Sequence, residues 1–477
     1  MKAVLAFLAV LTSVLVLEFG RKDVLISGFD VGQTPVTRYA IEGADGPAVV
    51  IAHGFAGSQQ MMQGYALPLA RAGYRVYAFE FLGHGRHTQP MSGDVTAVDG
   101  TTGLLVGQTN SVIDAISDGT PVALIGHSMA TDVLVRAAET RDDIGPMVLI
   151  SAFSQVVTAT HPARLLLVSG AWEGRLRAFG VEAVHMVDET VAEDEIAIAG
   201  AVERKAVAAP FSEHVSILQS RVARAEALAW LDRGFGRASD VTILPTGWAI
   251  LGLLGGLVLL FGPVARLLPD APLRQPPLGR AKFATLLIAP AVVAPLVAVP
   301  LNPDFLPVLV ADYLGLHLLV FGSVQLGLLR FWGVSWGRMA WLPFAVLLVW
   351  CALFGFALDR YAANFWPTAG RLWIIVVMLA GTLPFMVADT MLTAQASVLG
   401  RFLLRTSLLI SLGFAVALDF EGLFFLMLIA PVLVLFFLVF GTLGHSVSRR
   451  AGALPAGLAL GVVLAWALGV SFPIFQS

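Results

Sequence analysis

The stretch that decides the fold runs from Pro121 to Asp132 and reads Pro-Val-Ala-Leu-Ile-Gly-His-Ser-Met-Ala-Thr-Asp. Its apolar run at 122–125 predicts a buried strand, and a helical pattern follows directly after the turn. Ser128 stands at the apex of that turn. Residues two before and two after such a serine crowd each other, and Gly126 and Ala130 are small enough to fit there. The stretch therefore predicts a strand, a tight turn and a helix, with a serine hydroxyl at the tip.

Strand patterns alternate with helical patterns on both sides of this turn. The expected strands are an antiparallel hairpin at 24–30 and 36–42, then 48–52, 74–81, 146–150, 164–168 and 204–208. The expected helices are 59–72, 103–117, 129–140 and 215–231. Strands that alternate with helices favour a mostly parallel sheet with helices on both faces. We expect one domain of this kind over residues 23–240.

Three motifs in this domain resemble those of one family. They are His53-Gly54-Phe55, Leu82-Gly83-His84-Gly85 and Gly126-His127-Ser128-Met129-Ala130. Their order and spacing resemble the α/β-hydrolase superfamily, in its serine aminopeptidase-like and monoacylglycerol-lipase-like branch. The third motif is similar to the nucleophile elbow of that family, with alanine in the last glycine position. Glu80 departs from the branch, which usually has aspartate there. The resemblance implies the α/β-hydrolase fold.

The resemblance also implies a catalytic triad in the chain order serine, acid, histidine. A serine hydroxyl is a weak nucleophile until a base takes its proton, and Ser128 would be that serine. His214, in a loop after the last strand, is the expected base, and fits better than His185. Glu173 is the expected acid, with Asp188 in reserve; the acid would fix the tautomer of the histidine and stabilise its cation.

By the same resemblance, the backbone N–H groups of Phe55 and Met129 would form the oxyanion hole. His53, Gly54 and His127 are expected to line the substrate site, although the residue at the position of His53 is more often structural in this family.

Many relatives insert a helical cap after the sixth strand of the sheet. Here only residues 151–163 separate the strands expected at 146–150 and 164–168, which leaves no room for a cap. We therefore expect an open catalytic mouth, or one that the bilayer or a membrane bundle covers.

The composition changes sharply after residue 240. The whole chain of 477 residues is 57% hydrophobic and 13% charged, so much apolar surface must face lipid. Apolar runs of spanning length are expected near 244–265, 282–300, 305–329, 338–358, 372–393, 402–418, 422–442 and 453–475. They predict an all-α polytopic bundle of about eight spans over 243–477. The N-terminal run, residues 1–20, lacks a good cleavage site, which favours an uncleaved signal anchor over a cleaved signal peptide.

Basic residues in the short loops predict the orientation. With a cytoplasmic N-terminus, ten fall inside: Arg266, Arg274, Arg280, Lys282, Arg330, Arg338, Arg401, Arg405, Arg449 and Arg450. Only Arg360 and Arg371 fall outside. This bias predicts an extracytoplasmic hydrolase domain and C-terminus, as in a bacterial inner-membrane protein with a periplasmic catalytic domain.

Three ionisable residues fall inside predicted spans: Asp312 and His317 in one, and Asp389 in another. Such residues are candidates for function. The alternative is that Asp312 and Asp389 lie near helix ends and reach lipid headgroups. The spacing of five places Asp312 and His317 on different helix faces, which argues against a shared ion site.

Together these features predict a membrane-integrated serine hydrolase that cleaves esters of apolar or lipid-like substrates through an acyl-enzyme. The expected partners are that ester and membrane lipids. Two alternatives stay open: a transporter or binding protein with a degenerate hydrolase domain, and peptides as substrates. The net charge of −3 argues against nucleic acid, and no metal or cofactor is expected. The single cysteine, Cys351, lies in an apolar run and allows no disulfide.

Overall fold

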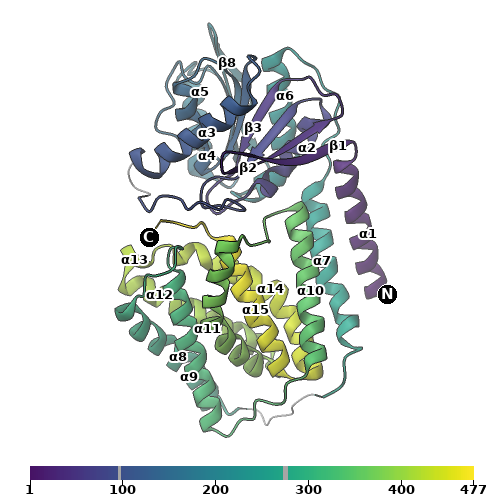
Figure 1. Cartoon of the computed structure of the whole chain (residues 1–477), viewed down its shortest axis with the longest axis vertical. Coiled ribbons are helices and arrows are strands. Elements are labelled where there is room, and N and C mark those ends of the chain that lie inside the picture. Colours follow the sequence, from purple (N-terminus) through teal and green to yellow (C-terminus); the bar gives the residue numbers. More distant parts are fainter. Residues whose placement is uncertain (95–97, 272–277, 477) are drawn as a thin grey trace.

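A computed structural model describes residues 1–94, 98–271 and 278–476. An α/β part stands above a bundle of long helices, and helix α1 (Lys2–Arg21) runs along the edge of the bundle to the first strand (Figure 1). Arg274, one of the basic loop residues, lies outside the described residues.

One nine-stranded sheet forms the α/β part. Its strands are β1 (Val24–Val31), β2 (Thr34–Ile41), β3 (Ala48–Ala52), β4 (Arg75–Phe79), β5 (Val122–His127), β6 (Ile144–Ile150), β7 (Arg164–Gly170), β8 (Ile196–Ala199) and β9 (Val202–Ala209). They lie in the order β1-β2-β4-β3-β5-β6-β7-β9-β8. The six strands from β4 to β9 in this order are parallel, and β1, β2 and β8 add antiparallel edges. This arrangement confirms the predicted mostly parallel sheet.

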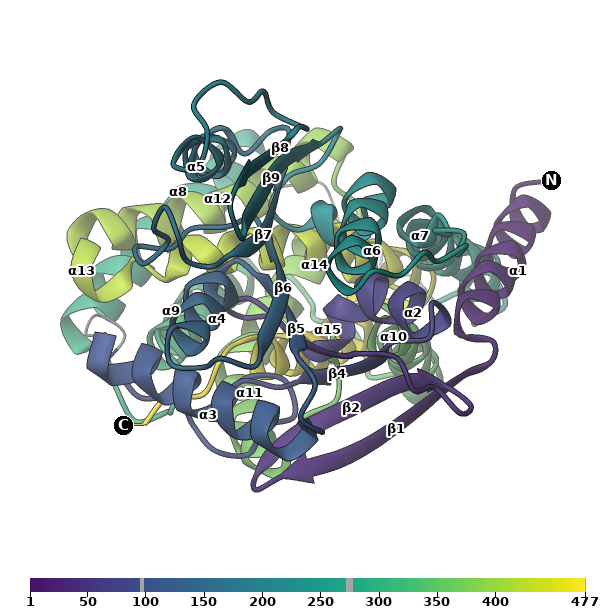
Figure 2. The ribbon, with the colours of Figure 1, turned by 90° about the horizontal axis from the view of Figure 1, so that it is seen from above.

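Helices cover both faces of the sheet (Figure 2). On one face, α2 (Gln63–Arg71) and α6 (Arg221–Phe235) pack on side chains such as Val49 and Ile51. On the other, α3 (Gly103–Ile116), α4 (Met129–Glu139) and α5 (Gly174–His185) pack on the alternate positions Val50 and Ala52. Successive strand side chains point to opposite faces, so these all-apolar strands are buried on both sides.

Several elements differ from the prediction. The helix expected at 59–72 starts with a 3₁₀ turn (Gln59–Met62) before α2, and α5 was not among the expected helices. The helix expected at 215–231 is broken: a short 3₁₀ turn, η3 (Ser216–Gln219), ends at Ser220, whose hydroxyl accepts a hydrogen bond from the Ala223 N–H and starts α6. Strand β8 was not predicted, because a four-residue edge strand is too short to show a period. The absence of a cap is confirmed, since residues 151–163 contain no helix.

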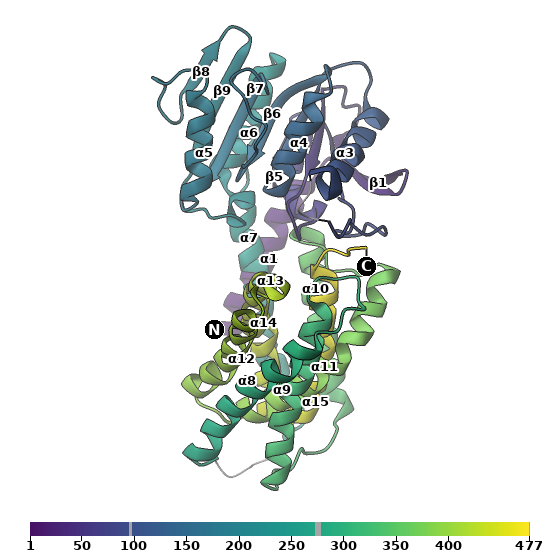
Figure 3. The same ribbon diagram turned by 90° about the vertical axis from the view of Figure 1, so that its left-hand side faces the viewer.

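Nine helices in the described part of the chain are long and apolar enough to cross a membrane, which is compatible with a membrane protein. Besides α1 they are α7 (Thr246–Ala265), α8 (Arg280–Leu301), α9 (Ala311–Phe331), α10 (Trp341–Tyr361), α11 (Ala369–Thr393), α12 (Val398–Leu418), α14 (Leu426–Ala451) and α15 (Ala453–Ser471). A short α13 (Phe420–Leu423) joins two of them. Helix α15 is the most enclosed, and lies inside the bundle in two perpendicular views (Figures 1 and 3).

The three ionisable residues that were expected inside spans, Asp312, His317 and Asp389, bond to neighbouring groups. The Asp312 carboxylate accepts hydrogen bonds from the N–H groups of Phe305 and Leu306 and so holds the loop before α9. Asp389 forms an ion pair with Arg405 at 3.1 Å. His317 bonds the Tyr313 hydroxyl at 3.0 Å and the Ser411 hydroxyl at 2.9 Å. These contacts link helices and loops within the bundle.

Candidate active site

Ser128 occupies a strained turn between β5 and α4. Its φ angle is 53°, a conformation that a non-glycine residue adopts only when its surroundings impose it. A Cβ on Gly126 would come within 2.7 Å of the Leu134 side chain and 3.2 Å of the Ala130 backbone. Glycine at 126 and alanine at 130 therefore let the chain turn sharply and lift the hydroxyl above the sheet edge.

The structure brings the three predicted triad residues together from three loops. His214 Nε2 lies 2.9 Å from Ser128 Oγ, and His214 Nδ1 lies 2.6 Å from Glu173 Oε1. The carboxylate is 7% exposed and the imidazole 44% exposed. A buried acid thus faces an accessible base and hydroxyl, which is the geometry that proton transfer from serine requires.

Glu173 is held by further donors. Its second carboxylate oxygen accepts hydrogen bonds from the Ser151 hydroxyl and the Gly170 N–H, each at 2.7 Å. Burial alone would raise the pKa of Glu173, but the hydrogen bonds from His214, Ser151 and Gly170 together hold that pKa below its ordinary value. The carboxylate stays ionised and fixes the orientation of the imidazole.

Sequence reasoning missed Ser151. It directly follows β6 with a φ of 51°, beside the other site loops. Ser151 could have been found from the sequence because it follows a parallel strand, and functional side chains gather at the carboxyl ends of such strands.

The two reserve candidates lie outside this network. The Asp188 carboxylate bonds the hydroxyl and N–H of Thr190, and the His185 ring bonds the Val191 carbonyl.

The backbone around the serine suits the predicted oxyanion hole. Met129 is the first residue of α4, and the first N–H groups of a helix have no partner within it. Phe55 follows Gly54 in the turn after β3. A Cβ on Gly54 would lie 3.0 Å from Ser128 Cβ, so only glycine lets this turn approach the nucleophile. The N–H groups of Phe55 and Met129 are thus candidates to bind one oxyanion.

His53 and His127 are buried rather than open to substrate. The Nδ1 of His53 bonds the Gly54 carbonyl and its Nε2 accepts from the Phe81 N–H, so both nitrogens serve the protein. His127 Nε2 bonds the His214 carbonyl at 2.8 Å and fixes the loop that carries the base. Both rings thus bond to backbone groups of the protein, whereas the sequence led us to expect them to bind substrate.

The edge of the sheet at which the parallel strands end and Ser128 lies, here called the catalytic edge, faces the helical bundle. The Phe55 ring lies 6.1 Å from the Phe425 ring and 6.5 Å from the Phe475 ring. The C-terminal tail pairs with the loop after β4: Met91 N–H donates to the Ile474 carbonyl, and Gln476 N–H to that of Met91. Figure 1 shows this tail between the two parts.

Two arginines add polar contacts between the α/β part and the helical bundle. Arg371 of α11 donates to the Gly83 carbonyl at 2.8 Å, and Arg86 pairs with Asp359 of α10 at 2.6 Å. The α/β part is therefore docked on the bundle through the loops that follow β3 and β4, next to Ser128.

Large apolar side chains are exposed along the same edge. Phe153 follows β6, Trp172 precedes the acid, and Phe211 and Val215 flank the base; they are 56%, 68%, 84% and 53% exposed. The carboxyl ends of parallel strands meet at one edge, so these side chains rim the triad. Exposed apolar groups of this kind, here called the apolar rim, are common where a protein contacts a membrane, another protein or an apolar ligand.

Residues 45–179 match a protein-family model described as "Serine aminopeptidase, S33". A curated epoxide hydrolase from Caballeronia sordidicola is 29% identical over 118 residues, which are 25% of this chain and 34% of the relative. The chain thus spans about a third of that relative's length.

Solved structures are similar to part of the chain. A predicted CIB-like hydrolase from Thermoplasma acidophilum is 14% identical, with a TM-score of 0.36 over 44% of this chain and 98% of its own. An epoxide hydrolase from an endophytic Streptomyces is 25% identical, with a TM-score of 0.23 over 28% of this chain and 38% of its own. Residues 45–179 thus match a model of an α/β-hydrolase family, and the mostly parallel sheet with helices on both faces is the α/β-hydrolase fold.

Proposed function

We propose that the chain is a serine hydrolase that cleaves esters of apolar or lipid-like substrates through an acyl-enzyme. The observation that carries this proposal is the hydrogen-bonded chain from Ser128 through His214 to Glu173. It lies beside two backbone N–H groups suited to an oxyanion. Nucleophile, base, orienting acid and electrophilic donors are the complete set that acyl transfer needs.

In the proposed reaction, His214 Nε2 takes the proton of Ser128 as its Oγ attacks the ester carbonyl carbon. Glu173 stabilises the imidazolium, and the N–H groups of Phe55 and Met129 stabilise the oxyanion. His214 then gives the proton to the leaving alcohol, which leaves the acyl group on the serine. Water, activated by the same imidazole, attacks that acyl carbonyl and releases the acid.

The names of some relatives suggest an epoxide as an alternative substrate. Opening of an epoxide by the Ser128 hydroxyl would form an ether, which has no carbonyl for water to attack. The enzyme would then stop after one turnover, whereas a serine ester is readily hydrolysed. The residue at the apex of the turn therefore favours acyl transfer.

The surroundings of the triad support an apolar substrate that arrives from the membrane. The exposed rim of Phe153, Trp172, Phe211 and Val215 and the ring of Phe425 lie at the edge that faces the bundle. An acyl chain that leaves lipid for such a rim stays out of water, and each methylene kept dry is worth about 0.8 kcal/mol. Substrate would thus reach the serine from the outer leaflet.

We further propose that α1 is a spanning anchor, that residues 23–240 lie outside the cytoplasm, and that residues 243–477 span the bilayer. In support, the far end of α14 carries Arg449 and Arg450, and Arg450 pairs with Asp270 just after α7. The two arginines predicted outside lie at the opposite end of the bundle. Arg360 pairs with Glu18 near the end of α1 and its carbonyl accepts from Gln63 of α2, while Arg371 donates to the Gly83 carbonyl.

Hydrolysis of p-nitrophenyl esters of graded acyl length, beside an aminoacyl p-nitroanilide, tests the substrate class. We expect turnover of the esters that rises with chain length in the full-length protein, and little with the anilide. Faster turnover of the anilide would assign the site to peptides.

A further inference from the structure

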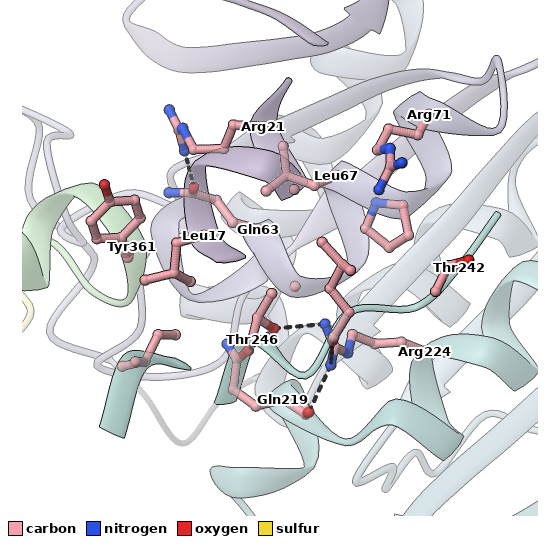
Figure 4. A pocket seen from close by; sticks show the side chains of 15 residues that line it. Leu17, Arg21, Gln63, Leu67, Arg71, Gln219, Arg224, Thr242, Thr246 and Tyr361 are labelled. Atoms are coloured by element: carbon pink, nitrogen blue, oxygen red, sulfur yellow. Dashed lines mark hydrogen bonds between the residues drawn. The ribbon is translucent and has the colours of Figure 1, made fainter. Parts of the chain in front are cut away.

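A second pocket lies away from the triad, where α1, α2, α6 and α7 meet (Figure 4). Its walls come from the last turn of α1, from α2 of the hydrolase domain, from the segment 219–224 and from the start of α7. It therefore sits at the level where the anchor helix leaves the bundle and enters the α/β part.

Positive charge dominates the lining of this pocket. Arg21, Arg71 and Arg224 line it, and none of its fifteen lining residues is Asp or Glu. Two of these guanidinium groups have nitrogens to spare. Arg21 uses one nitrogen, at 2.5 Å from the Gln63 side-chain oxygen. Arg71 has no hydrogen bond or ion pair with the described residues and lies over the Phe19 ring at 5.5 Å.

Arg224 has a different place in the pocket. It is 2% exposed and donates to the carbonyls of Ser220, Gln219 and Leu244 and to the Thr246 hydroxyl. These bonds hold Arg224 in the pocket wall, where it contributes positive charge. The N–H groups of Arg21 and Arg71 are available to bind a ligand.

The rest of the wall is apolar and continuous with the surface of α1. Leu17, Leu67, Leu244 and Ile250 line the pocket, and α1 exposes large apolar side chains such as Leu15 just below it. A ligand that fits would carry a negative head and an apolar body, side by side along a helix axis. Phosphate esters of diacylglycerol have that chemistry, and arginine binds phosphate through paired N–H donors.

We propose that this pocket binds the phosphate group of an anionic phospholipid from the leaflet on the α/β side, between Arg21 and Arg71, with an acyl chain along α1 and α7. A bound headgroup would join the anchor to the hydrolase domain at a point that the catalytic residues do not use. Binding at this pocket would not depend on the reaction at Ser128.

Native mass spectrometry of the full-length protein tests the proposal. The protein is released from micelles that contain equal amounts of phosphatidylglycerol and phosphatidylcholine, and the ratio of the two bound lipids is measured. We expect phosphatidylglycerol to be preferred, and Arg71→Gln to lower that ratio about fivefold, since one basic side chain near a membrane surface is worth about 1 kcal/mol. Arg21→Gln should have a similar effect.

Arg175→Gln is the matched control, because Arg175 is exposed on α5, away from the pocket. Arg71→Gln breaks no hydrogen bond among the described residues, and an unchanged melting temperature in phosphatidylcholine alone shows that the variant folds. An unchanged lipid ratio in both pocket variants would overturn the proposal. So would equal stabilisation of the wild type by inorganic phosphate and by phosphatidylglycerol, because the ligand would then be a free anion.

Discussion

Each residue of the proposed triad is placed by a neighbour that takes no part in proton transfer. Gly126 allows the positive φ of Ser128, His127 holds the loop of His214 through its carbonyl, and Ser151 fixes Glu173. Such supporting contacts matter because reacting groups must stay within a few tenths of an ångström of the productive geometry.

Ser128→Ala and His214→Ala should each lower kcat on a short p-nitrophenyl ester by about 10³-fold or more. The double variant should lose little beyond either single one, because the two residues act as one unit. Steady-state kinetics on the three purified variants checks this. Losses that multiply in the double variant would mean that the two residues act separately, and the proposed proton transfer would be wrong.

The buried ring of His127 predicts how stability depends on pH. Burial, with a smaller effect of His214, lowers the pKa of His127 to about 4. In the unfolded chain the histidine pKa is near 6.5, so between pH 6.5 and 4 the unfolded chain binds more protons than the folded protein. The free energy of unfolding therefore falls as pH drops through this window. His127 contributes at most about 1.4 kcal/mol per pH unit to this loss of unfolding free energy.

His127→Gln keeps a donor for the His214 carbonyl but cannot titrate. The melting temperature of this variant should therefore fall less than that of the wild type between pH 6.5 and 5. Parallel melting curves across that range would contradict a buried neutral imidazole at this position.

At the scale of elements, sequence periodicity located the strands and the long apolar helices because both are apolar and bounded by polar loops. The largest difference is at α14, which ends at Ala451 instead of near 442. The strand expected at 48–52 and the span expected at 244–265 match β3 and α7 to within two residues. The four-residue β8 and the break at Ser220 carry no periodic signal. The three residues of the proposed triad could be singled out because strand ends and family motifs mark them. The pairing of Met91 with Phe475 could not be predicted from the sequence, because it depends on how the α/β part docks on the bundle.

That docking predicts that the bundle takes part in binding substrate at the catalytic edge. Phe425→Ala and Phe475→Ala each remove a ring beside Phe55, and such contacts are worth about 0.5–1.5 kcal/mol. Each variant should lose about 2–10-fold in kcat/KM on long-chain esters and little on short ones.

The matched control for this comparison is Phe331→Ala, because Phe331 ends α9 and is 83% exposed. Chain-length profiles of all three variants decide the question. Equal losses on short and long esters would show that the two rings support the fold and do not guide the acyl chain.

At the scale of the whole molecule, the α/β-hydrolase part is joined to the helical bundle at both ends, through α1 and α7, and is docked on it at the catalytic edge. Two tethers and a docked face hold the triad at a fixed height above the proposed bilayer. On the proposed function, an enzyme held at this height would meet substrates that diffuse within the plane of the membrane.

This arrangement predicts the topology of the chain in the membrane. Alkaline phosphatase, which folds only in the periplasm, should be active when fused after Gly236 and inactive when fused after Gly337, in the loop between α9 and α10. Both fusions should be present in equal amounts on a blot. Activity in the second fusion alone would place the catalytic edge in the cytoplasm.

The central claim is that Ser128 is an activated nucleophile, and covalent labelling tests it most directly. A fluorophosphonate reacts with a serine only where a base and an oxyanion hole activate it. The full-length native protein should be labelled on Ser128, as located by peptide mass spectrometry, and both Ser128→Ala and heat-denatured protein should remain unlabelled. A wild-type protein that takes up no label, or a Ser128→Ala variant labelled to the same extent, would contradict the account.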